Sequence, residues 1–116
     1  SIDQYPLNLI AEPYGIFFTE ATIPEVDGVS FEAEPVQFYR PNFAEHAITT
    51  NIERVGASDS LPGSLIVDPP AIPLVWGSDE TMDSDKFRNP PILAVNEEAG
   101  LGKLVCLQHA SYVVNF

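Results

Sequence analysis

The stretch between positions 79 and 85 is the best candidate for binding a cation. Four of its seven residues carry carboxylates, and these are Asp79, Glu80, Asp83 and Asp85. Carboxylate oxygens suit Ca²⁺, so these four residues form the predicted divalent-cation site. The spacing departs from the helix–loop–helix calcium loop, because, with Asp83 counted as the first position, no glycine stands at the sixth and Ala94 occupies the twelfth. The alternative, which the sequence favours, is a solvated acidic loop with Lys86 and Arg88 as local partners.

Cys106 and His109 form a second candidate pair, since a thiol and an imidazole together bind metals or act as a nucleophile and its base. On a regular strand, residues three apart point to opposite faces, so the two side chains cannot meet without a bulge. We therefore expect Cys106 to be a small buried thiol beside an unrelated histidine. His46 is the other histidine of the sequence, so a zinc site would need carboxylates or a second chain.

Motifs of catalysis are missing from the sequence. It contains no glycine-rich phosphate loop and no Gly-x-Ser-x-Gly nucleophile turn. Its single cysteine cannot form an internal disulfide, so the chain is not a small disulfide-stabilised scaffold. An enzyme is therefore unsupported by these residues, and a non-enzymatic protein is the preferred interpretation.

The charge balance restricts the partners. Seventeen acidic residues stand against five basic ones, for a net charge of −12. Nucleic acid and anionic membranes bind clustered Lys and Arg, so both are excluded as direct partners. A basic protein surface or bound cations are the complements that remain. The first residues lack the features of a signal peptide and no apolar run approaches the ~20 residues of a membrane span, so we expect a soluble chain of undetermined location.

Eleven prolines and seven glycines divide the chain into short pieces. Such punctuation favours strands over long helices. We expect an all-β fold, mainly an antiparallel sandwich or barrel of seven to nine short strands, with at most one short helix near 43–55. Residues 1–116 are expected to form a single β-rich domain with an extended N-terminal arm (1–6) and a proline-rich loop region (57–91).

The run Lys103–Phe116 is predicted to be one long strand at the centre of the sheet. It contains no glycine or proline, and both of its faces are largely apolar. Two strands joined by a turn at 108–111 are the alternative, but those residues have no turn chemistry. The other predicted strands are 7–11, 14–20, 29–34, 36–40, 64–67, 72–76 and 91–95.

Two further segments carry specific predictions about strand placement and about the single helix. Pro73 confines its strand to an edge or a bulge. Residues 42–56 fit a helix capped by Asn42 and Gly56, which we prefer, but the pair Thr49 and Thr50 also fits a strand. The predicted core consists of Ile16, Phe18, Phe31, Phe38, Ile66, Leu74, Leu93, Val105, Leu107 and Val113.

These features predict a structural or interaction protein, a small acidic β module that packs against protein partners as a homo-oligomer or in a larger assembly. Proteins of this style decorate or cement shells such as viral capsids, so a virion component is one version of this expectation. An accessory or catalytic enzyme subunit with a cation at 79–85 is one alternative. A ligand-binding β-barrel lined by Phe17, Phe31, Phe38 and Tyr112 is the other.

Overall fold

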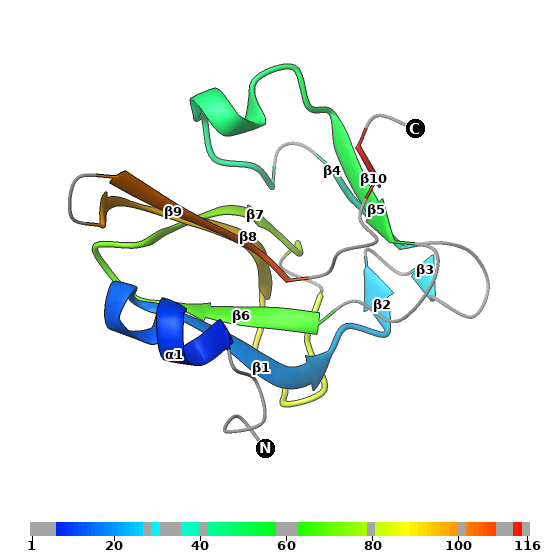
Figure 1. The fold of residues 1–116 in the computed structure, drawn as a ribbon. Helices are drawn as coiled ribbons and strands as arrows, with labels where there is room; N and C mark the ends of the chain where they lie inside the picture. Colours follow the sequence, from blue (N-terminus) through cyan, green and yellow to red (C-terminus); the bar gives the residue numbers. More distant parts are fainter. Residues whose placement is uncertain are drawn as a thin grey trace.

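Antiparallel strands make up most of the computed structural model shown in Figure 1. The structure describes residues 7–26, 29–30, 36–39, 42–57, 63–78, 81–99, 102–108 and 113–114. It contains one short α-helix in these ranges, so the prediction of a mainly antiparallel β fold with a single short helix is confirmed. No helix in the described ranges is long and apolar enough to cross a membrane.

Seven of the described strands have four residues or more. They are β1 (Ile16–Thr22), β4 (Val36–Tyr39), β5 (Arg54–Ala57), β6 (Gly63–Val67), β7 (Ile72–Trp76), β8 (Pro91–Ala99) and β9 (Gly102–Leu107). Three strands have two residues each, namely β2 (Glu25–Val26), β3 (Val29–Ser30) and β10 (Val113–Val114). The strands pair as β1-β6, β2-β3, β10-β5-β4 and β7-β8-β9, all of them antiparallel.

The central strand of the molecule is β8, because apolar side chains cover both of its faces. Leu93 and Val95 belong to a core cluster shared with β4 and β5, whereas Ala94 belongs to a second cluster shared with β1 and β6. The first cluster consists of Ile23, Val26, Phe38, Phe43, Val55, Leu74, Val75, Ile92, Leu93 and Val95. The second consists of Ala11, Ile16, Phe18, Leu65, Ala71, Ala94 and Cys106.

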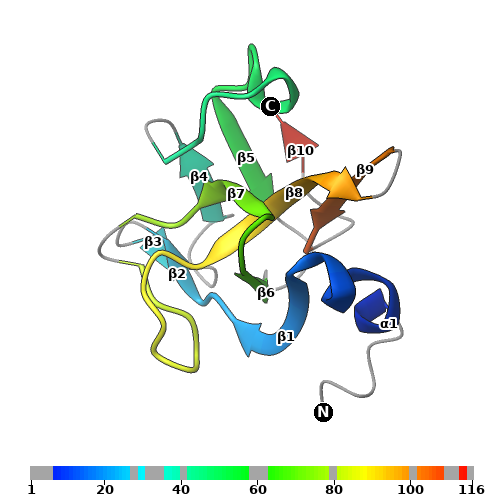
Figure 2. The ribbon, with the colours of Figure 1, turned by 90° about the vertical axis from the view of Figure 1, so that its left-hand side faces the viewer.

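The prediction of one long central strand over 103–116 is wrong. β9 pairs with β8 as far as Leu107, whereas β10 joins β5 in a different sheet. Gln108 fixes the break, because its backbone N–H donates to the carbonyl oxygen of Ile92 and its side chain accepts a hydrogen bond from the Gly63 N–H. The run 103–116 therefore contributes residues to strands of two different sheets, and β9 lies at the edge of its sheet rather than at the centre (Figure 2).

Residues 7–11 were expected to be a strand, but they form the helix α1 (Leu7–Ala11). A 3₁₀ helix, η2 (Glu12–Tyr14), continues it and ends at Gly15, whose φ is 84°. An added Cβ at Gly15 would collide with the backbone oxygen of Asp68. Only glycine combines this left-handed conformation with so close an approach, and it turns the chain directly into β1.

The preferred helix over 42–56 is also wrong. The segment forms a single 3₁₀ turn, η3 (Ala47–Thr49), capped by His46 instead of Asn42, and then enters β5. The physical reason lies in backbone pairing with β7, since Trp76 N–H donates to the Asn42 oxygen at 3.1 Å and Ala44 N–H to the Leu74 oxygen at 2.8 Å. These bonds hold residues 42–44 extended where the helix was expected to begin.

Strand β7 begins and ends at the predicted residues, and Pro73 lies at an irregularity of the strand pairing, as expected from the sequence. β7 pairs with one strand, β8, within the described residues, and its register shifts between Pro73 and Val75.

Of the predicted core, five residues are buried, namely Ile16, Phe18, Phe38, Leu74 and Leu93. Ile66, Val105 and Leu107 are exposed instead, and the side chains of Phe31 and Val113 lie outside the described residues.

Candidate functional site

The two described carboxylates of the predicted cation site have different surroundings. Asp83 is buried and Asp85 is exposed, while Asp79 and Glu80 lie outside the described residues. The Asp83 carboxylate accepts backbone hydrogen bonds from Asp85 at 2.9 Å and from Phe87 at 3.1 Å. It thus closes its own loop, as a carboxylate often does with nearby backbone N–H groups.

The same carboxylate also ties the loop to the sheet. Ser64 Oγ donates to Asp83 Oδ2 at 3.0 Å, and the Ser64 hydroxyl lies 3.0 Å from that of Thr19. All three side chains are buried, so this polar chain joins β1, β6 and the loop after β7. Among the described residues, no three His, Cys, Asp or Glu side chains gather to hold a metal ion. The four-carboxylate cation site therefore stays a prediction.

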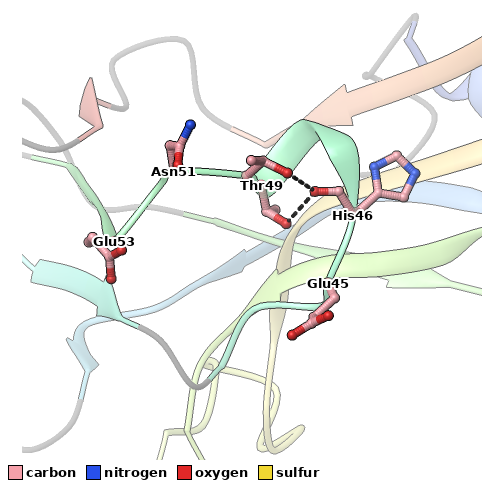
Figure 3. A pocket seen from close by; sticks show the side chains of 6 residues that line it. Glu45, His46, Thr49, Asn51 and Glu53 are labelled. Carbon is pink, nitrogen blue, oxygen red and sulfur yellow. Dashed lines mark hydrogen bonds between the residues drawn. The ribbon is translucent and has the colours of Figure 1, made fainter.

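A polar hollow of about 350 Å³ lies beside the 3₁₀ turn η3 and is shown in Figure 3. Its lining consists of Glu45, His46, Thr49, Thr50, Asn51 and Glu53. The hydroxyls of Thr49 and Thr50 both donate to the backbone oxygen of His46, at 3.1 and 3.0 Å. Figure 3 shows the His46 ring pointing away from Asn51 and Glu53, so the polar side chains do not converge on one point.

Both ring nitrogens of His46 are engaged in hydrogen bonds. The Ile48 N–H donates to Nδ1 at 3.0 Å, so the hydrogen of the neutral ring lies on Nε2, which donates to Glu97 Oε1 at 2.9 Å. The hydrogen bond from His46 holds the pKa of Glu97 below its ordinary value, with a smaller contribution from Lys103, whose Nζ lies 3.6 Å away. His46 therefore acts as a cap and a tether between η3 and β8, with no nitrogen left for a ligand.

Cys106 is a buried free thiol, as expected from the sequence, and burial raises its pKa. A raised pKa keeps the thiol protonated and weakens it as a nucleophile. His109, the other residue of this candidate pair, lies outside the described residues, so the expectation that the two side chains are unrelated is not tested.

The clearest unusual feature is the orientation of α1, which turns its large apolar side chains outward. Asn8 is buried, with 4% of its surface exposed, whereas Leu7, Leu9 and Ile10 are exposed by 54, 82 and 60%. The Asn8 side chain fixes this orientation, because its Nδ2 donates to the Phe18 oxygen at 3.0 Å and its Oδ1 accepts from the Phe18 N–H at 2.7 Å. An amphipathic helix normally does the opposite and buries its large apolar residues.

An apolar hollow of about 220 Å³ lies next to this helix, between α1 and β9. Its lining carries no charged side chain and consists of Leu7, Ile10, Ala11, Phe18, Leu104, Val105, Cys106 and Leu107. On β9, Val105 and Leu107 are exposed by 47 and 42%. Leu7 and Ile10 of α1 and Val105 and Leu107 of β9 line this one hollow, and we call these four residues, together with the neighbouring Leu9, the α1–β9 surface.

Sequence reasoning missed this surface because it assigned 7–11 to a strand and 103–116 to a buried one. The spacing of Leu7, Ile10 and Ala11 was a helical signal, since residues three and four apart share a helix face. That signal alone would bury Leu7 and Ile10, and the long-range bonds between Asn8 and Phe18 reverse the orientation.

Comparison of this chain with protein-family models, with curated proteins and with solved structures found no match.

Proposed function

We propose that this chain is a non-enzymatic interaction module that works in a larger protein assembly and docks through the α1–β9 surface. The observation that supports it is the orientation of α1, where a polar residue faces the core and Leu7, Leu9 and Ile10 face outward. Contiguous exposed apolar surface is characteristic of protein–protein contact sites. Two hydrogen bonds at Asn8 hold these side chains in place before any partner arrives.

The chemistry of the other candidate sites is consistent with this proposal. His46 has both nitrogens occupied, and the carboxylate of Asp83 serves to hold its own loop. The thiol of Cys106 is buried and its pKa is raised. These three groups are buried or have hydrogen-bond partners within the fold, whereas Leu7, Leu9 and Ile10 are exposed.

Replacement of Leu9 by serine tests the proposal. Leu9 is the most exposed of the three helix residues, so the substitution should leave the unfolding temperature within about 2 °C of the wild-type value. Burying a leucine in a contact is worth about 1.5–3 kcal/mol. The variant should therefore weaken assembly by roughly 10- to 100-fold, as measured by light scattering over a concentration series of the native complex.

Phe87→Ser is the matched control, because Phe87 is also a large exposed side chain, at 63%, but lies on the loop after β7. It should leave assembly unchanged. A wild-type chain that remains a monomer and purifies from its source without any partner would refute the proposal. Equal assembly of the Leu9→Ser variant and the wild type would also refute it.

A further inference from the structure

The two outer edges of the β7-β8-β9 sheet differ in their backbone pairing with other described residues. Along β7, residues 42–44 occupy the outer edge through backbone bonds to Leu74 and Trp76 and a bridge between Phe43 and Val75. Along β9, every backbone pairing among the described residues runs to β8. No described residue pairs with the outer edge of β9, so an added strand could pair with the N–H and C=O groups on that edge.

The apolar hollow runs beside this edge. It is lined from one side by the α1 residues Leu7 and Ile10 together with Phe18, and from the other by the whole stretch 104–107 of β9. Successive residues of a strand point to opposite faces, and β9 contributes both faces to the lining. Since Cys106 is buried whereas Val105 and Leu107 are exposed, a strand laid alongside β9 would find apolar neighbours on both of its own faces.

The net charge of the chain indicates which class of partner fits this hollow. The chain carries a net charge of −12, so a second copy would bring another −12 to the contact. The one basic residue on β9, Lys103, lies 3.6 Å from Glu97, and residues 104–107 are all uncharged. Complementary charge favours a partner that is basic around an apolar centre.

We propose that the outer edge of β9 binds an extended segment of a different protein as an added strand, apolar in its centre and carrying Lys or Arg at both ends. Main-chain hydrogen bonds to β9 hold the segment, and the hollow beside β9, which is one part of the α1–β9 surface, receives its alternate side chains, as in other cases of strand addition. This assignment rests on the proposed function and names the class of partner that the surface takes.

A synthetic peptide is the probe. Its centre has about six alternating Val and Thr residues, to match the length of β9, and two lysines flank each end. Fluorescence anisotropy should give saturable binding that weakens as salt is raised, since screening acts on the flanking charges. The same peptide with glutamates in place of the lysines should bind at least about tenfold more weakly.

Methylation of the peptide nitrogens tests strand pairing directly. Alternate N–H groups of a strand point to opposite edges, so two peptides are made, each N-methylated on one alternate set. One of them should lose binding by at least about tenfold and the other should keep it, because only one set faces β9. Hydrogen exchange at the β9 amides should slow when the unmethylated peptide is bound.

Protein variants separate this inference from the proposed function. Val105→Thr, beside the edge, should weaken peptide binding several-fold, whereas Ile72→Thr, at a similarly exposed position on β7, should not. Leu9→Ser should leave peptide binding intact, because Leu9 does not line the hollow.

Equal binding of the two methylated peptides, or of the lysine and glutamate peptides, would overturn the inference. So would the absence of saturable binding, or a dimer of the chain alone that protects the β9 amides. If assembly through α1 persists in these cases, the proposed function stands and only the strand-addition mechanism fails.

Discussion

Asn8→Ala is the substitution that most directly tests how this surface is built. The Asn8 side chain stands in for a neighbouring strand, since its amide satisfies both the N–H and the C=O of Phe18 on β1. Alanine removes both partners and leaves two backbone groups of a buried residue without them. A buried polar group without a partner costs about 1–3 kcal/mol.

Two such groups give an expected loss of about 2–4 kcal/mol in the free energy of unfolding, because water entering beside α1 recovers part of the loss. That loss is a large part of the ~5–15 kcal/mol that stabilises a typical domain. For a chain of 116 residues, it corresponds to a fall of roughly 8–16 °C in the unfolding temperature.

Urea denaturation followed by circular dichroism measures this difference. Leu9→Ala, one position further along the same helix, is the control and should change the free energy of unfolding by no more than about 0.5 kcal/mol. Amide exchange at Phe18 should accelerate in Asn8→Ala relative to the control. If the two variants are equally stable, the Asn8 side chain does not fix the orientation of α1 and our reasoning is wrong.

Three other predictions concern the rest of the fold. Gly15→Ala should lower the free energy of unfolding by at least about 1–3 kcal/mol, because strain at a positive φ adds to the collision of the new Cβ with the Asp68 backbone oxygen, whereas Gly102→Ala, which has open space around it, should be neutral in the same urea titration. NMR titration should give Glu97 a pKa below the ordinary 4.5, so the contribution of Glu97 to stability is full above about pH 4.5 and is lost as the pH falls through the lowered pKa. His46→Asn, which keeps a capping side chain, should raise the pKa of Glu97, and an unchanged pKa would contradict the pairing. Asp83→Ala removes the acceptor of three hydrogen bonds and should destabilise the protein by about 2–4 kcal/mol with or without added Ca²⁺. A loss of stability seen only with Ca²⁺ would show instead that Asp83 acts as a metal ligand.

Strands whose signals are local could be predicted from the sequence. The run Ile72–Trp76 is correct at both ends because flanking Pro and Gly residues delimit it, and Pro73 forces the irregular pairing that is observed. β1 and β4 were found from their aromatic and β-branched residues. Buried core residues such as Phe38 and Leu74 followed from the same patterns.

Segments whose structure depends on distant partners could not be predicted. Residues 42–44 are extended because β7 pairs with them, and no local pattern in 42–56 encodes that pairing. The run 103–116 has a uniform apolar pattern, but two different strands, β8 and β5, recruit its two halves. The pattern correctly indicated extended chain and gave no information on which sheet each half joins.

The candidate site was harder to predict because its determinants are single polar contacts. The pairing of His46 with Glu97 spans 51 positions, and that of Asn8 with Phe18 spans ten. Neither pairing forms a motif, so neither could be recognised before the structure. The acidic run at 79–85 was visible by composition, but half of the predicted ligands lie outside the described residues.

The closed edge at β7 sets a limit on how far the β7-β8-β9 sheet can grow. Residues 42–44 already occupy that edge, and Pro73 has no N–H to offer there. A segment can therefore pair directly with β9 but not with β7, whose outer backbone groups already bond to residues 42–44. Open-ended stacking of the kind that produces fibres requires two free edges. The expected stoichiometry is one bound segment per chain, and the complex should remain finite at high concentration.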